Sequence, residues 1–309
     1  FLCYLASKLF FVDTHILTVN KLSKSFGRIN AVSSLSFSVT RGQVVGVLGP
    51  NGSGKTTTLA LILGIKHPDS GSFEWFNGIK GAVANRRIGS LLEVPYFYPY
   101  LNLKRNLEIT ARIRGAKLDG VGEVLSLVGL SERSNTPYYT LSLGMKQRLA
   151  IASALIGDPE VLLLDEPTNG LDPVGIADVR RIIKEQASSG KTIIMASHIL
   201  AEVEKVCTEL LILKEGHLIA QGKVAQLLSN KPLVSLSAPN MEALRTAISE
   251  HPGLKTIEST PERIVISLEK GLDAAQINQW LLERGVALSA IETHKDTLES
   301  HFLKMVKGG

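Results

Sequence analysis

The chain has 309 residues, 44% of them hydrophobic, and its formal net charge is +5. It can therefore bury a sizeable core, in one large domain or in two smaller ones. A mild positive charge spread along the chain favours an ordinary charged surface over a binding surface for nucleic acid or an anionic membrane. The two cysteines, Cys3 and Cys207, lie far apart without metal-binding spacing, so we expect no zinc site and a reducing compartment.

Residues 1–15 differ from the rest of the chain. Residues 1–12 are apolar but interrupted by Lys8; they are too short for a membrane span and lack a signal-peptide cleavage pattern. The alternatives are upstream sequence, an artefact or a small interfacial helix. We favour an artefact, because the folded pattern begins at Ile16. No run of about 18 uninterrupted apolar residues follows, so we expect no membrane-spanning helix.

From Ile16 onward, strand patterns alternate with helix patterns. Short apolar or alternating runs predict strands at 16–22, 31–39, 44–49, 72–76, 161–165 and 192–197, and a hairpin over 209–222. Helices are expected over 56–65, 102–115, 120–130, 143–156, 174–186 and 199–206. This alternation predicts an α/β domain over 16–230 with a parallel sheet, interrupted by a helical insert over about 94–157.

A glycine-rich run between a predicted buried strand and a predicted helix indicates phosphate binding. Residues 49–57 read GPNGSGKTT and match the pattern G-x-x-x-x-G-K-[ST]. The glycines allow the backbone to turn and to approach a phosphate without a Cβ in the way. The loop precedes a helix, whose free N–H groups and dipole favour an anion.

Two side chains of this loop have a predicted chemical role. Lys55 can reach the β- and γ-phosphates, and the Thr56 hydroxyl can bind Mg²⁺. The alternative is a plain glycine turn, which the full spacing and the flanking elements disfavour. The residues that we predict to bind the nucleotide through this loop are Gly49, Asn51, Gly52, Ser53, Gly54, Lys55, Thr56 and Thr57.

Polar residues follow two other predicted buried strands. Asp165 and Glu166 come after the apolar run 161–164, at the carboxyl end of a strand, where open α/β sheets bind ligands. Asp165 is positioned to hold Mg²⁺, and Glu166 to act as a general base toward a water that attacks the γ-phosphate. His198, after the strand at 192–197, is predicted to contact the γ-phosphate or to orient that water. A solvated acid pair and a structural histidine are the alternatives.

A second anion-binding helix start is predicted near residue 142. In LSLGMKQRL (141–149), Ser142 and Gly144 lie where a helix begins. One chain rarely directs two such ends at one phosphate, so we expect a two-fold dimer in which this segment faces the nucleotide on the partner. A capped helix start without such a role is the alternative.

Phe26 lies about thirty residues before Lys55. Its ring is predicted to stack on the nucleotide base, and packing in the core is the alternative.

After about residue 230 the sequence pattern changes. Strand and helix patterns follow in the order β-α-β-β-α-β, and a closing helix is expected over 297–306. This order predicts a small C-terminal α+β domain over 231–309 with a ferredoxin-like fold.

Taken together, these motifs resemble the nucleotide-binding subunit of ATP-binding-cassette (ABC) transporters over residues 16–228. GPNGSGKT resembles the Walker A loop, LSLGM the signature, VLLLDE the Walker B strand, NGLD the D-loop and SH the switch histidine. The resemblance implies a P-loop NTPase fold, with a RecA-like parallel sheet core, an antiparallel β subdomain and a helical insert. It also implies ATP and Mg²⁺ as cofactors.

Two departures from the family pattern are informative. Leu143 and Met145 replace a glycine and a glutamine of the usual LSGGQ signature, whereas Ser142 and Gly144 remain. Glu93 stands where the family usually has a glutamine, at the hinge before the helical insert, and is predicted to lie beside Mg²⁺. This glutamate resembles the variant found in ATPases of bacitracin and lantibiotic resistance exporters; an ordinary surface acid is the alternative.

The resemblance therefore predicts an ATP-hydrolysing subunit of a bacterial exporter at the cytoplasmic face of the membrane. A separate permease and a second copy of the chain are the expected partners, without nucleic acid. The groove near Glu93 with Tyr96, Phe97, Tyr98 and Tyr100 is the predicted contact for the permease. The alternative is that these aromatic side chains pack the helical insert. The alternative function is a soluble ABC ATPase that acts on nucleic acid or ribosomes.

Overall fold

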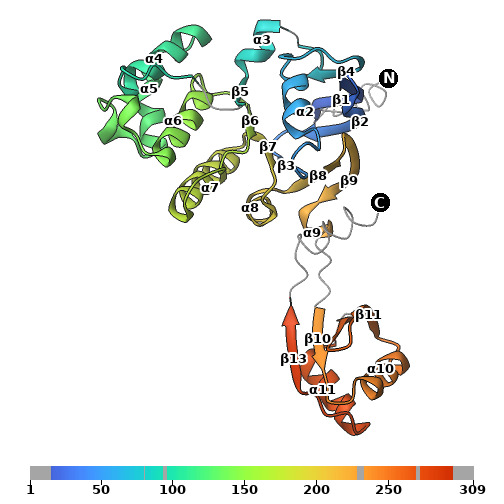
Figure 1. Ribbon diagram of the computed structural model, residues 1–309. Helices are drawn as coiled ribbons and strands as arrows, with labels where there is room; N and C mark the ends of the chain where they lie inside the picture. Colours follow the sequence, from blue (N-terminus) through green and yellow to red (C-terminus); the bar gives the residue numbers. More distant parts are fainter. Residues whose placement is uncertain (1–14, 80, 93–95, 228–232, 269–271, 295–309) are drawn as a thin grey trace, which may run out of the picture. The chain divides into compact units, whose positions relative to one another are not determined.

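The computed structural model describes residues 15–79, 81–92, 96–227, 233–268 and 272–294 (Figure 1). The chain divides into two compact units, Phe1–Val224 and Ala225–Gly309. Residues 1–14, Glu93 and the predicted closing helix over 297–306 lie outside the described residues. None of the helices within the described ranges has the length and apolar character needed to cross a membrane.

The first unit is built on a six-stranded sheet with the strand order β5-β6-β7-β3-β8-β9. The first five strands in this order are parallel, and β9 pairs antiparallel with β8. The strands are β3 (Val44–Leu48), β5 (Ile88–Leu91), β6 (Val161–Asp165), β7 (Thr192–Ser197), β8 (Glu209–Lys214) and β9 (His217–Lys223). The predicted parallel sheet is confirmed, and every residue of β3 and β7 is buried, as expected for strands covered on both faces.

A second, antiparallel sheet belongs to the same unit, with the order β2-β1-β4. Its strands are β1 (His15–Phe26), β2 (Ile29–Thr40) and β4 (Ser70–Trp75). β1 and β2 are longer than predicted because register irregularities let both strands continue through the breaks in their apolar pattern.

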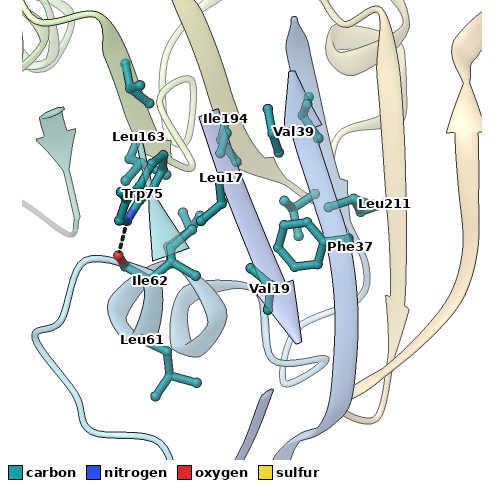
Figure 2. Close-up of a cluster of buried hydrophobic side chains, with 14 of the residues drawn as sticks. Leu17, Val19, Phe37, Val39, Leu61, Ile62, Trp75, Leu163, Ile194 and Leu211 are labelled. Atoms are coloured by element: carbon teal, nitrogen blue, oxygen red, sulfur yellow. Dashed lines mark hydrogen bonds between the residues drawn. The ribbon is translucent and has the colours of Figure 1, made fainter. Parts of the chain in front are cut away.

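The apolar core of this unit lies where the two sheets meet the P-loop helix α2 (Lys55–Ile62). Trp75 donates a hydrogen bond from Nε1 to the Ile62 carbonyl oxygen (2.6 Å), which ties α2 to the antiparallel sheet (Figure 2). The helix that presents the P-loop is therefore held from both sides. The buried side chains drawn around it include Leu17, Val19, Phe37, Val39, Leu61, Leu163, Ile194 and Leu211.

The helical insert consists mainly of α4 (Leu103–Arg114), α5 (Gly120–Leu127) and α6 (Leu143–Leu155), which pack on one another. α4 starts at an Asn102 cap and stops at Gly115, whose φ of +66° favours glycine. The remaining helices of the unit are α3 (Gly81–Arg86), α7 (Pro173–Ser188) and α8 (Leu200–Val206); the short α9 (Val224–Leu227) spans the point in the chain where the two units divide. The short helix α3 was not predicted, because six residues are too few for a clear helical period.

The second unit follows the order β10 (Leu233–Ser237), α10 (Met241–Glu250), β11 (Leu254–Ser259), β12 (Ile264–Leu268), α11 (Ala274–Glu283) and β13 (Ala290–His294). Its sheet is antiparallel with the order β11-β12-β10-β13, in agreement with the predicted split βαβ arrangement. α10 and α11 bury their apolar faces in a separate core with members such as Leu236, Leu244, Ile266 and Leu281.

Candidate nucleotide-binding and hydrolysis site

The P-loop joins β3 to α2 through a backbone that requires glycine at two positions. A Cβ on Gly49 would lie 2.2 Å from Ser53 Oγ and 2.5 Å from the Leu213 carbonyl oxygen. Gly54 caps α2 with a φ of +99°, and a Cβ there would lie 2.2 Å from the Ala31 carbonyl oxygen. The loop is therefore a tight cradle at the start of a helix, where backbone N–H groups are free to bind an anion.

Lys55 is buried and points back into this cradle. Its Nζ donates hydrogen bonds to the carbonyl oxygens of Gly49 (2.9 Å) and Pro50 (3.2 Å), and lies 3.6 Å from Glu166 Oε1. A buried ammonium needs such partners. It is thus held at the mouth of the loop, in position to meet a phosphate.

Glu166 and His198 meet beside this lysine. His198 Nδ1 lies 2.8 Å from Glu166 Oε2, and the Glu166 backbone N–H donates to the Ala196 carbonyl oxygen (2.9 Å). Glu166 has a φ of +46°, an uncommon left-handed conformation for a glutamate that directs its side chain differently from the strand residues before it.

Glu166 and His198 thus directly follow the neighbouring strands β6 and β7, and Lys55 starts α2 at the end of the loop that follows β3, the next parallel strand of the sheet. Ligand sites of open α/β sheets lie at this edge. The arrangement combines a cation for an anionic ligand with a carboxylate next to an imidazole, which suits general-base chemistry.

The other residues predicted for this site differ in exposure. Asp165 ends β6 and is half-buried, whereas Asn51, Gly52 and Thr56 are exposed at the loop, ready for contact from solvent. Thr57 is half-buried in the first turn of α2. Glu93, predicted to lie beside Mg²⁺, is outside the described residues.

Two buried hydroxyl groups have no hydrogen-bond partner among the described residues, Ser53 Oγ and Thr168 Oγ1. Ser53 belongs to the P-loop, so its hydroxyl suits a phosphate or metal-bound ligand. Thr168 was not predicted as a site residue. Its place two residues after Glu166 was the signal that could have identified it.

Phe26 is 43% exposed, so the alternative to base stacking, packing of this residue in the core, is wrong. The Nζ atoms of Lys24 and Lys66 lie 5.7 and 5.3 Å from the ring centroid. An exposed aromatic ring with nearby ammonium groups is available for stacking.

Ser142 caps α6, and its Oγ accepts a hydrogen bond from the Met145 backbone N–H (3.3 Å). Gly144 faces open space, since nothing lies within 4 Å of a Cβ built there, and Leu143 is 56% exposed. The Ser142 carbonyl oxygen also accepts a hydrogen bond from the Lys146 N–H (2.9 Å), another residue of α6. This helix start therefore presents an open surface.

Comparisons with known proteins identify the family. Residues 32–169 match the profile of a family described as ABC transporter. The chain is 37% identical over 300 residues to the bacitracin transport ATP-binding protein BcrA of Bacillus licheniformis, covering 95% of this chain and 98% of the relative. The chain belongs to the ABC transporter family. It is an ATP-binding subunit, as the motifs predicted.

Other ABC transporter relatives agree with this assignment. A BcrA protein of Enterococcus faecalis is 31% identical, covering 96% of this chain and 97% of the relative. The lantibiotic transport ATP-binding protein SrtF of Streptococcus pyogenes is 38% identical, covering 67% of this chain and 90% of the relative. These similarities support the transporter interpretation over the alternative in nucleic-acid or ribosome biology.

Solved structures confirm the fold of this ABC subunit. The structure of an ATP-binding subunit of an ABC transporter matches with a TM-score of 0.62 and 30% identity, over 69% of this chain and 91% of that one. A dimeric ATP-binding cassette in a post-hydrolysis state, with ADP and Pi, matches with a TM-score of 0.61 and 25% identity, over 67% of this chain and 98% of that one. The predicted ABC ATPase identity is thereby confirmed.

Proposed function

We propose that this chain hydrolyses ATP with Glu166 as the general base and thereby drives a bacterial exporter through a separate permease. The observation that carries the proposal is the group of Lys55, Glu166 and His198, joined by distances of 3.6 and 2.8 Å at one edge of the parallel sheet. This group provides a phosphate ligand, a base and a residue that orients the base.

In the proposed reaction Lys55 exchanges its loop carbonyl partners for the β- and γ-phosphates of ATP. Glu166 accepts a proton from the water that attacks the γ-phosphate, and His198 orients Glu166 and contacts the γ-phosphate. Displacement of Lys55 by the phosphates also removes its contact with Glu166, so the carboxylate becomes free to act on water.

Magnesium fits the oxygen donors of this site. The exposed Thr56 hydroxyl and the Asp165 carboxylate are hard ligands, and Mg²⁺ in nucleotide sites takes only one or two protein ligands besides phosphate oxygens and water. We propose Thr56 and Asp165 as these ligands, with Glu93 nearby. The ion would neutralise charge on the transferred phosphoryl group.

Phe26 is our proposed stacking surface for the nucleotide base, because its exposed ring is tolerant of base identity. We further propose a head-to-tail dimer of two chains, in which Ser142 and Gly144 of one copy contact the nucleotide on the other copy's P-loop. The open surface at the start of α6 supports this arrangement.

The exporter assignment rests on the bacitracin and lantibiotic transport relatives, and a peptide antibiotic is the cargo class we propose. The subunit would then act at the cytoplasmic face of the membrane. Tyr96, Tyr98 and Tyr100 are exposed, as a surface that contacts a permease requires, whereas the Phe97 ring packs at a tilt of 50° against Tyr138, with a centroid distance of 5.2 Å.

A cavity of about 420 Å³ adds a second surface for the permease. None of the four predicted aromatic residues lines it, but Ser90, three residues before Glu93, does. We propose that it receives an apolar segment of the permease, because Ile65 and Ile113 at its rim are 63% and 81% exposed. Its lining consists of Leu63, Ile65, Asn85, Arg86, Ile88, Ser90, Ile113 and Arg114.

The test is steady-state ATP turnover by the wild type, Glu166→Gln and Lys55→Ala, together with equilibrium ATP binding. Glu166→Gln keeps the shape of the side chain but removes the base, so we expect ATP binding and ATP-dependent dimerisation with a loss of about 10²-fold or more in kcat. Lys55→Ala removes charge-assisted bonds to phosphate, and its ATP affinity should fall about 10- to 100-fold.

Two results would contradict the proposal. Wild-type turnover by Glu166→Gln would exclude Glu166 as the base, and unchanged ATP affinity of Lys55→Ala would exclude the P-loop assignment. Capture of the tagged chain from its own detergent-solubilised membranes tests the transport part: recovery of a polytopic membrane protein is expected, and recovery of ribosomal partners alone would exclude it.

A further inference from the structure

A buried ion pair joins the two helices that follow the D-loop and His198. Glu202 of α8 is only 6% exposed. Its Oε2 accepts a hydrogen bond from Arg180 Nε and its Oε1 accepts one from Arg180 Nη2, each 3.0 Å long. Arg180 belongs to α7, so the pair links two consecutive helices that are separated in the chain by β7.

This pair balances the buried charge of Glu202, and it also sets how α7 and α8 are oriented to each other. A guanidinium that donates two parallel bonds sets both the distance and the angle of the carboxylate. Lys205 Nζ lies 3.6 Å from Glu202 Oε1, but its side chain is 50% exposed, so it is the weaker partner. Arg180 is therefore the stronger of the two cationic partners that hold the Glu202 carboxylate.

α8 is held equally closely on the side of the P-loop strand. A Cβ on Gly46 of β3 would lie 2.4 Å from Val203 Cγ1 and 3.0 Å from Cys207 Sγ. α8 thus packs against the backbone of the strand that leads into the P-loop. Burial raises the pKa of the Cys207 thiol to about 12, so this residue packs as an apolar group.

The loop that carries His198 has little freedom between these elements. It runs from the end of β7 to the start of α8, and the Ile199 N–H donates to Ser197 Oγ (3.0 Å). Only four positions separate His198 from Glu202. A rotation or shift of α8 therefore moves the imidazole relative to Glu166, 2.8 Å away.

We propose that Glu202 is a positioning residue for ATP hydrolysis, which through its bidentate pair with Arg180 aligns α8 and His198 with Glu166. The same pair links this site to α7, whose N-cap, Asp172, is the last residue of the D-loop. This inference rests on the proposed function, because it assigns no role in the absence of hydrolysis at Glu166.

The test compares the full-length wild type with Glu202→Gln and Arg180→Lys. Glu202→Gln removes the charge, and Arg180→Lys keeps the charge but lacks the planar fork. For both variants we expect kcat to fall about tenfold or more, while the ATP dissociation constant stays within about twofold, because misplaced catalytic groups impair the reaction more than binding. Arg180→Lys supplies the answer if Glu202→Gln does not fold.

The matched control is Glu185→Gln, which removes an ion pair on the exposed face of the same helix. Arg181 Nη1 lies 2.8 Å from Glu185 Oε1, and both side chains are 48% exposed. This variant should retain wild-type kcat. Thermal unfolding of every variant measures how much of the protein is folded. A merely structural effect would lower the folded fraction, ATP binding and turnover together.

The inference would be overturned if Arg180→Lys, and Glu202→Gln where it folds, had the kcat of the wild type. It would also be overturned if their turnover fell only in proportion to the amount of folded protein. An inactive wild type, or a fully active Glu166→Gln, would instead overturn the proposed function. The two failures are therefore distinguishable.

Discussion

Glu160 shows how a single carboxylate stabilises the nucleotide-binding unit from outside the site. It pairs with Arg41 and accepts two hydrogen bonds from Arg87, of 2.6 and 2.9 Å. The Arg87 bonds, assisted by Arg41 and opposed by partial burial, lower its pKa from 4.5 to about 2. Arg87 also stacks on Phe76, 3.9 Å from the ring centroid, so one acid connects the turn after β2, the start of β5 and the start of β6.

A pH dependence of stability follows from this lowered pKa. The charged form is favoured in the folded state, so its stabilisation is fully present above pH 4.5 and is lost as pH falls toward about 2. We expect Glu160→Gln to have a lower free energy of unfolding than the wild type at about pH 6, with a difference that narrows by about pH 3. Urea unfolding at several pH values measures this, and a constant difference would contradict it.

At the scale of elements, the strands and helices that position the site were predictable because their signals are local. The apolar runs before residues 49, 166 and 198 each gave a buried strand, and the parallel arrangement placed Lys55, Glu166 and His198 at one edge. Sheet order and side-chain pairs are long-range: Arg41 and Glu160 are 119 positions apart, and no periodicity connects them. The Arg180–Glu202 pair was missed for the same reason.

Helix packing on the P-loop strand gives a prediction at this scale. Gly46→Ala places a Cβ against Val203 of α8 and against Cys207, which caps the end of that helix, and both pack too closely to admit it. We expect a loss of about 1–3 kcal/mol in the free energy of unfolding from overpacking. Gly122→Ala in α5 is the control, because nothing lies within 4 Å of its Cβ and alanine there should stabilise the helix by about 0.5–1 kcal/mol. Denaturant titration measures both, and equal effects would exclude the packing argument.

At the scale of the whole molecule, a single chain brings together one part of the predicted site, the group of Lys55, Glu166 and His198. Ser142 caps α6 and a Cβ on Gly144 would meet nothing within 4 Å, so the start of α6 has an open surface, and the proposed dimer is what gives it a ligand. A substitution that leaves the single chain folded and able to bind ATP, but prevents dimerisation, would test the proposed dimer separately from the site within one chain.

Gly144→Asp is such a substitution. A Cβ there meets nothing within 4 Å, and an acidic side chain in the first turn of a helix is favourable, so the single chain should keep its stability and ATP affinity. In the dimer the new carboxylate would face the γ-phosphate of the partner's nucleotide, and like charges repel. We therefore expect Gly144→Asp, placed in the Glu166→Gln background, to remain monomeric with ATP in sedimentation analysis. Gly120→Asp, at the start of α5 with equally open surroundings, is the matched control and should dimerise. ATP-dependent dimerisation of both variants would mean that the start of α6 does not face a nucleotide.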